Sequence, residues 1–214
     1  MLELKHVSYS YQSYQEEIFS DVNYQFKNGT FYSIIGQSGA GKSTLLSLLA
    51  GLDNPNKGQV LFDGEDIQTK GSSYHRKHHV SLVFQNYNLI DYLTPLENVR
   101  LVNSKASPSI LLDLGLEQSQ INRSVMKLSG GQQQRVAIAR ALATKPAIIL
   151  ADEPTGNLDS KTSMDVILLM QSISRQFHQT TIMITHNEEI AQMADRTIRI
   201  EDGKVVSGGV RYAR

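Results

Sequence analysis

The stretch Gly36-Gln37-Ser38-Gly39-Ala40-Gly41-Lys42-Ser43-Thr44 decides the fold of this chain. It matches G-x-x-x-x-G-K-[ST], the pattern of a phosphate-binding loop. Residues 31–35 predict a short buried strand before it, and residues 45–50 predict a helix after it. Glycines let backbone N–H groups point inward, and the helix N-terminus adds its positive dipole end. We therefore expect a nucleotide phosphate site; the alternative is a turn that matches by chance.

Two side chains of the loop have expected roles in the chemistry. In phosphate-loop enzymes the lysine contacts the β- and γ-phosphates, and the hydroxyl after it binds Mg²⁺. Lys42 and Ser43 occupy these two places. The sequence therefore predicts a bound nucleotide with its metal ion.

A second stretch predicts the rest of the metal site. Residues 147–153 form an apolar run that ends in two acids, which is typical of a buried strand with carboxylates at its end. Burial of two carboxylates at a strand end costs free energy. Their presence here therefore points to a bound metal and a proton acceptor. We expect Asp152 to hold Mg²⁺ and Glu153 to orient or deprotonate the attacking water. The alternative is a plain acidic turn before Pro154.

A third stretch, Leu128-Ser129-Gly130-Gly131-Gln132, precedes a predicted helix from Gln133 to about Thr144. Ser129 is a natural N-cap, and the two glycines leave backbone N–H groups open at the positive end of the helix. This is a second potential anion-binding end in a chain with one phosphate loop. It is either an ordinary capped helix or a site for the phosphate of a nucleotide that a second copy supplies.

The remaining pattern predicts one α/β domain over residues 1–214. Strands are expected at 2–7, 22–26, 59–62 and 80–84, with a closing hairpin over 196–206. Residues 86–127 predict an all-helical insert, so the core comprises about 1–85 and 128–214. A helix is expected over 160–177, with core positions at 166, 169, 170, 173 and 177.

Composition limits the class of partner. Lys plus Arg and Asp plus Glu both number 21, so the net charge is zero and nucleic acid is not an expected partner. The chain has no cysteine, no N-terminal signal pattern and no apolar run of membrane-spanning length. Any work at a membrane would need a separate anchor.

Two histidine-bearing stretches leave alternatives open. His186 follows the predicted strand 180–185, where it is either structural or faces the nucleotide. Residues 71–79 are polar and basic, with three histidines. We expect a solvated loop there, with a metal site or a partner contact as alternatives.

Taken together, these residues resemble the ATP-binding-cassette ATPases, the nucleotide-binding subunits of ABC transporters. The most specific element is the segment 128–132, which matches the signature of that family, and the likeness extends over nearly the whole chain. The resemblance implies a phosphate-loop ATPase fold with a mixed sheet, an antiparallel β edge and a short helical subdomain. It also implies ATP and Mg²⁺ as ligands. Two cassettes would pair head to tail, each closing its signature over the other's ATP.

The resemblance also implies roles for further residues. Tyr11 resembles the aromatic residue that stacks on adenine, with Tyr9 and Tyr14 as alternatives. Gln85 resembles the residue that senses Mg²⁺ and the attacking water, and His186 resembles the γ-phosphate sensor. Asp159 lies in the loop that crosses the dimer interface. Ser129, Gly130, Gly131 and Gln132 would contact the nucleotide of the other copy.

Residues 149–159 look like the bacterial branch for lipoprotein release, macrolide efflux and bacteriocin or peptide export. The 43 residues between Gln85 and Ser129 make a shorter insert than that branch leads us to expect. The implied function is an ATP-hydrolysing subunit at the cytoplasmic face of the membrane that powers separate permease subunits. The alternative is a soluble, non-transport cassette that acts on ribosomes or nucleic acid. A plain phosphate-loop kinase or GTPase would leave the segment 128–132 unexplained.

Overall fold

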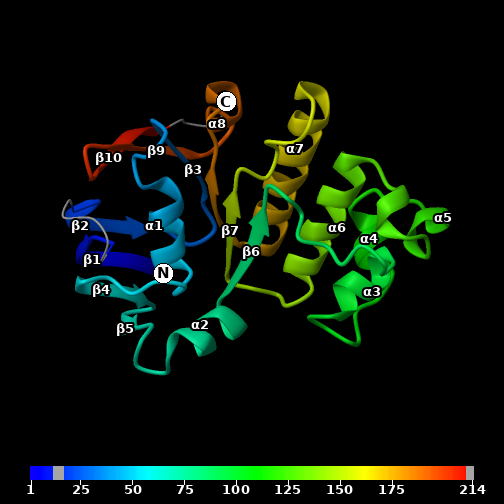
Figure 1. Ribbon diagram of the computed structural model, residues 1–214, viewed down its shortest axis with the longest axis horizontal. Coiled ribbons are helices and arrows are strands. Elements are labelled where there is room, and N and C mark those ends of the chain that lie inside the picture. Colours follow the sequence, from blue (N-terminus) through cyan, green and yellow to red (C-terminus); the bar gives the residue numbers. More distant parts are fainter. Residues whose placement is uncertain (12–16, 211–214) are drawn as a thin grey trace.

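The computed structural model describes residues 1–11 and 17–210. Two β-sheets lie on either side of one helix, and further helices cover the outer face of the larger sheet (Figure 1). The larger sheet has six strands in the order β10-β9-β3-β8-β7-β6. Its strands are β3 (Phe31–Gly36), β6 (Val80–Phe84), β7 (Ile148–Asp152), β8 (Thr180–Ile184), β9 (Arg196–Glu201) and β10 (Lys204–Val210).

The larger sheet is parallel except for its last pair. Strands β9, β3, β8, β7 and β6 run in one direction, and β10 returns antiparallel to β9 as the closing hairpin predicted by the sequence. The strand before the phosphate loop, β3, lies between β8 and β9. The carboxyl ends of these five parallel strands therefore meet along one edge of the sheet.

The smaller sheet is antiparallel throughout, in the order β2-β1-β4-β5. Its strands are β1 (Leu2–Tyr9), β2 (Phe19–Phe26), β4 (Lys57–Phe62) and β5 (Glu65–Asp66). Helix α1 (Lys42–Leu49) lies between the two sheets, and its buried leucines share one core with both. The predicted antiparallel edge is thus a separate sheet that packs on the first helix.

The other face of the larger sheet carries a second core. The side chains of β7 point alternately into the two cores: Ile148 and Leu150 face α1, whereas Ile149 and Ala151 face the outer helices. The helices over this core are α3 (Pro95–Arg100), α4 (Ser109–Asp113), α5 (Gln118–Ile121), the short 3-10 helix η1 (Val125–Lys127), α6 (Gly130–Leu142) and α7 (Ser160–Phe177). A four-residue helix, α8 (Glu188–Ala191), follows β8.

Several sequence-based boundaries were wrong. Residues 86–94, expected to belong to an all-helical insert, form turns and irregular backbone. The first helix of the insert begins at Pro95, where Thr94 and Glu97 form the capping box that their spacing predicts. Helix α6 begins at Gly130 instead of Gln133, because the signature glycines themselves form its first turn. Phe177, expected in the core, is 59% exposed at the end of α7.

The basic stretch 71–79 was expected to be a solvated loop and is instead the helix α2 (Ser72–His78). Its His75 is only 1% exposed. The His75 ring packs edge-on against Phe62, and its Nε2 lies 3.1 Å from the carbonyl oxygen of Leu49 at the end of α1. The segment is helical because it packs this histidine between α1 and β4. Within the described residues, no group of three or more His, Cys, Asp or Glu side chains is placed to hold a metal.

Candidate functional site

The phosphate loop turns sharply between β3 and α1. Gly41, the N-cap of α1, has φ +93°, and a Cβ on it would lie 2.7 Å from Ile18 and 2.9 Å from Phe19. Only glycine tolerates both that backbone conformation and that contact. Because Gly41 has no side chain, the first N–H groups of α1 have no side-chain cap. They point to the position of an anion at the helix N-terminus.

Lys42 adds a positive charge to this anion site. Its Nζ donates hydrogen bonds to the carbonyl oxygens of Gly36 (3.0 Å) and Gln37 (2.8 Å). These contacts hold the ammonium group against the backbone of the loop. This position fits the role expected for it from the sequence.

Ser43 and Asp152 come together across the sheet edge. The Ser43 hydroxyl donates to Asp152 Oδ1 over 3.5 Å. Burial raises the pKa of Asp152; the Ser43 hydrogen bond and Lys42 lower the pKa, and Glu153 raises it. A hydroxyl and a carboxylate oxygen are the hard ligands that Mg²⁺ prefers, with phosphate and water oxygens completing its shell. A carboxylate destabilised by burial beside that hydroxyl therefore fits a divalent cation.

Glu153 and His186 form the next pair along this edge. His186 Nδ1 lies 3.2 Å from Glu153 Oε2, although the two residues come from the ends of different strands. Glu153 has φ +46°, in the left-handed region that side chains other than glycine rarely adopt. Its backbone N–H donates to Ile184 at the end of β8 (3.1 Å), which stabilises this conformation. Such strain is typical of functional positions.

A cavity of about 1320 Å³ opens beside the phosphate loop. Its wall contains Tyr11 and His186 as well as the loop, so the structure brings these predicted residues together. The Tyr11 hydroxyl lies 3.1 Å from Thr44 Oγ1, and the ring is 39% exposed. Tyr9 is 7% exposed and belongs to the core, whereas Tyr14 lies outside the described residues.

Sequence reasoning missed part of this wall. Ile18 at the start of β2 and the turn between β9 and β10, with Asp202 and Gly203, also line the cavity. They come from opposite ends of the chain and carry no motif. Only the pairing of β9 with β3 brings that turn beside the phosphate loop.

Gln85 lies on the same edge but has other partners. Its Nε2 donates to Asn157 Oδ1 (3.2 Å), and Asn157 Nδ2 donates back to the Gln85 carbonyl (3.1 Å). A Cβ on Gly156 would lie 2.6 Å from the Gln85 amide nitrogen. The side chain therefore packs over the loop that follows Glu153, and its hydrogen bonds go to that loop. A role at the metal remains a prediction.

The signature segment (residues 128–132) forms the start of α6. Ser129 Oγ accepts from the Gln132 N–H (3.3 Å), and Gln132 Oε1 accepts from the Ser129 N–H (2.9 Å), a complete capping box. No residue of this segment is among those that line the cavity beside the phosphate loop in the described part of the chain. The signature segment therefore lies apart from the cavity of its own chain, and binding of an anion at this helix end stays a prediction.

Asp159 stands at the start of α7, next to the signature segment. Its carboxylate accepts from the Thr162 N–H (3.0 Å) and hydroxyl (2.6 Å), and these bonds lower its pKa. A Cβ on Gly131 would overlap the Thr162 methyl group. The second signature glycine is thus required by packing within the chain as well as by any contact with phosphate.

Comparison with known proteins agrees with this geometry. Residues 19–156 match the family described as ABC transporter. The chain is 41% identical to an uncharacterized ABC transporter ATP-binding protein, YclH, of Bacillus subtilis, covering 95% of this chain and 94% of that protein. It is 39% identical to the lipoprotein-releasing system ATP-binding protein LolD 1 of Rhodopseudomonas palustris, covering 89% and 90%.

A solved structure gives the same architecture. An ATP-binding cassette of Methanocaldococcus jannaschii, a dimer in a post-hydrolysis state bound to ADP and Pi, superposes with a TM-score of 0.85. It is 37% identical, and the match covers 100% of both chains. No helix in residues 1–11 or 17–210 of the present chain is long and apolar enough to cross a membrane.

Proposed function

This chain belongs to the ABC transporter family as an ATP-binding protein, and from that premise we propose that it hydrolyses ATP with Mg²⁺ to power an export or mechanotransmission system. The energy would pass to separate membrane subunits, with the chain bound at the cytoplasmic face of the membrane. The observation that carries the proposal is the edge where β3, β7 and β8 end. There Ser43 contacts Asp152, and Glu153 contacts His186, which lines the cavity together with residues 36–40 of the phosphate loop.

Each of these side chains has a distinct task. Lys42 and the N–H groups of α1 bind the β- and γ-phosphates. Ser43 and Asp152 would hold Mg²⁺, which when bound neutralises charge on the phosphate oxygens. Glu153 accepts a proton from the attacking water, and His186, 3.2 Å away, orients that carboxylate and faces the γ-phosphate.

The position of the signature segment supports a head-to-tail pair. Ser129 is exposed, and its helix end does not line the cavity of its own chain. A second copy would present its Ser129 and Gly131 to the ATP held here. Asp159 would lie at the interface between the copies. The site is complete only when two chains meet.

A surface beside β6 with both apolar and basic side chains supports a membrane partner. This strand is at the edge of the sheet, next to a cavity of about 200 Å³ between α6 and Val102. In the segment after Gln85, Tyr92 is 85% exposed, and Leu101, next to Val102 in the sequence, is 58% exposed. We propose that a helix of the membrane subunit binds this surface. The relative in the lipoprotein-releasing system favours a partner of that kind.

Two measurements test the proposal. A tagged chain purified from its native membranes in mild detergent should recover an integral membrane protein; recovery of ribosomes or nucleic acid instead would support the non-transport alternative. The Glu153→Gln variant should elute as a dimer with ATP and as a monomer without it. A variant that stays monomeric at saturating ATP would contradict the head-to-tail pair.

A further inference from the structure

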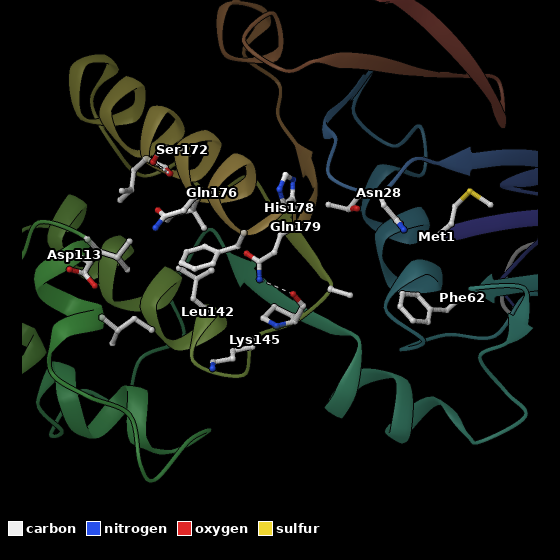
Figure 2. A pocket seen from close by; sticks show the side chains of 18 of the residues that line it. Met1, Asn28, Phe62, Asp113, Leu142, Lys145, Ser172, Gln176, His178 and Gln179 are labelled. Atoms are coloured by element: carbon white, nitrogen blue, oxygen red, sulfur yellow. Dashed lines mark hydrogen bonds between the residues drawn. The ribbon is translucent and has the colours of Figure 1, made fainter.

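A second cavity lies at the opposite edge of the larger sheet from the phosphate loop. We call it the basal groove: it has a volume of about 730 Å³ and runs past the start of β8 and the carboxyl-terminal ends of α6 and α7 (Figure 2). Thr180, which begins β8, lines it, whereas the phosphate loop follows the carboxyl end of β3. None of the nucleotide-site residues described above lines this groove.

One wall of the groove is apolar. Leu142 at the end of α6 and Ile173 and Phe177 on α7 line it. Phe177 is 59% exposed although it lies on the apolar face of its helix. A volume of this size with a mainly apolar wall is in the range of sites for small organic ligands, about 300–1,000 Å³.

Inside the groove a buried polar atom lacks a partner. The Gln179 side chain is 7% exposed, and its Nε2 donates to the carbonyl oxygen of Pro146 (2.7 Å). Its Oε1 is buried and has no hydrogen-bond partner among the residues that the structure describes. The Nε2 bond fixes the orientation of the amide, so the oxygen cannot exchange places with the nitrogen. A buried acceptor of this kind is costly, and a ligand with an N–H or O–H group would satisfy it.

A positively charged side chain also lines the groove. Lys145 precedes Pro146, and its backbone N–H donates to Leu142 (2.8 Å), so it belongs to the same part of the groove. Lys145 is exposed and forms no ion pair with any described residue. Two acidic residues also line the groove. Asp113 lies on α4, at the left of Figure 2. Asp63 forms an ion pair with the N-terminal amine of Met1. Lys145 therefore offers its ammonium group to an acidic part of a ligand.

We propose that the basal groove binds a small amphipathic anion. An aromatic or aliphatic body would pack on Leu142, Ile173 and Phe177, a donor group would bind Gln179 Oε1, and an acidic group would pair with Lys145. The ligand would contact the carboxyl ends of α6 and α7, the two helices whose N-caps are Ser129 and Asp159. The site is separate from the nucleotide cavity and does not depend on the proposed transport function.

Anilinonaphthalene sulfonate is a suitable probe because it combines aromatic rings, one N–H donor and a sulfonate. Its fluorescence should rise on titration with the purified full chain and saturate with one dye per chain. Lys145→Met and Phe177→Ser should each weaken binding by about tenfold, as loss of one good contact does. Both side chains are exposed, so the fold should persist, and circular dichroism would check this.

The matched controls are Lys105→Met and Leu168→Ser, which remove a charge and an apolar side chain from exposed positions outside the groove. They should leave the affinity for the dye unchanged. Equal loss in the control variants, or no loss in the groove variants, would overturn the proposal. Displacement of the dye by ATP together with full binding by Lys145→Met would place the dye in the nucleotide cavity and overturn it as well.

Discussion

Arg140 Nη2 donates a hydrogen bond to the backbone carbonyl of Tyr87 over 3.0 Å, and its Nη1 donates to the next carbonyl, of Asn88, over 2.6 Å. Arg140 belongs to α6, the helix that begins with the signature segment, whereas Tyr87 follows Gln85. Both acceptor residues have left-handed backbones, with φ of +54° and +49°. Arg140 therefore stabilises a strained turn and connects the two segments that the sequence assigned to separate tasks.

Replacement of Arg140 tests this connection. Arg140→Met should lower the free energy of unfolding by about 1–3 kcal/mol, because two carbonyls lose charge-assisted hydrogen bonds. Urea denaturation followed by circular dichroism would measure the loss. Arg123→Met, at an exposed position in the same subdomain, is the control and should change stability by less than about 0.5 kcal/mol. An equal effect of both variants would contradict the role of the Tyr87 contact.

The signature glycine Gly131 offers a second test. Gly131→Ala should cost about 1–3 kcal/mol of stability, because the added methyl group overlaps the Thr162 methyl. Thr162→Ser keeps the hydroxyl that bonds Asp159 and removes the overlapping methyl. The double variant Gly131→Ala/Thr162→Ser should therefore regain most of the stability that Gly131→Ala loses, as measured by urea denaturation of the single and double variants. Additive losses would mean that the strain lies elsewhere.

The role of Glu153 predicts a change in rate without a change in ATP affinity. Glu153→Gln should lower ATP turnover by about 10²–10⁴-fold, since the amide cannot accept the proton of the attacking water. A phosphate-release assay and a nucleotide-binding titration would measure the two quantities separately. Glu65→Gln, in the antiparallel sheet, should leave the rate unchanged. An unchanged rate in Glu153→Gln would remove Glu153 from the mechanism.

Asp152 should lower the stability of the metal-free protein. Burial raises its pKa in the folded state, so its ionisation destabilises the fold as pH rises from the unfolded pKa of about 3.9 through the folded value. At pH 7 this cost is complete, and Asp152→Asn removes it. The variant should melt at a higher temperature than wild type in a chelator, with a difference that shrinks toward acidic pH.

Asp159→Asn is the control, because it should change the melting temperature in the opposite direction. The pKa of Asp159 is lowered by its bonds to Thr162, so its charge stabilises the fold above the unfolded pKa, and this contribution is lost as pH falls. Its replacement should lower the melting temperature slightly at pH 7. If both Asn variants shift the melting temperature in the same direction, the assignment for Asp152 is wrong.

The buried His75 predicts a loss of stability in acid. Burial lowers its pKa, the bond to Leu49 raises it, and His79 and Arg76 lower it further. The unfolded state therefore binds more protons below the unfolded pKa of about 6.5, so stability is constant above this pH and falls as pH drops through it. In His75→Gln, the midpoint of urea denaturation should depend less on pH between neutral and acidic conditions. His178→Asn, at an exposed position, should leave the slope unchanged.

The sequence by itself predicted the parts of the site that depend on contiguous residues. The phosphate loop 36–44, the acidic strand end at Asp152 and the capped helix after Ser129 were each recognisable because a strand, a turn and a helix start follow local rules of backbone geometry and capping. Helix α7 was predicted with its observed bounds for the same reason, because its apolar spacing is long and regular.

Only the tertiary structure decided how these parts meet. The pairing of β3 with β8 and β9 brings His186 and the turn at Gly203 to the phosphate loop, and no local pattern contains that register. Residues 72–78 form a helix instead of the expected loop, because His75 is buried against α1 and this packing outweighs the polar composition of the segment. The contact of Gly131 with Thr162 is likewise a property of two packed helices. Local rules determine which groups the chain offers, whereas sheet order and packing determine which of them touch.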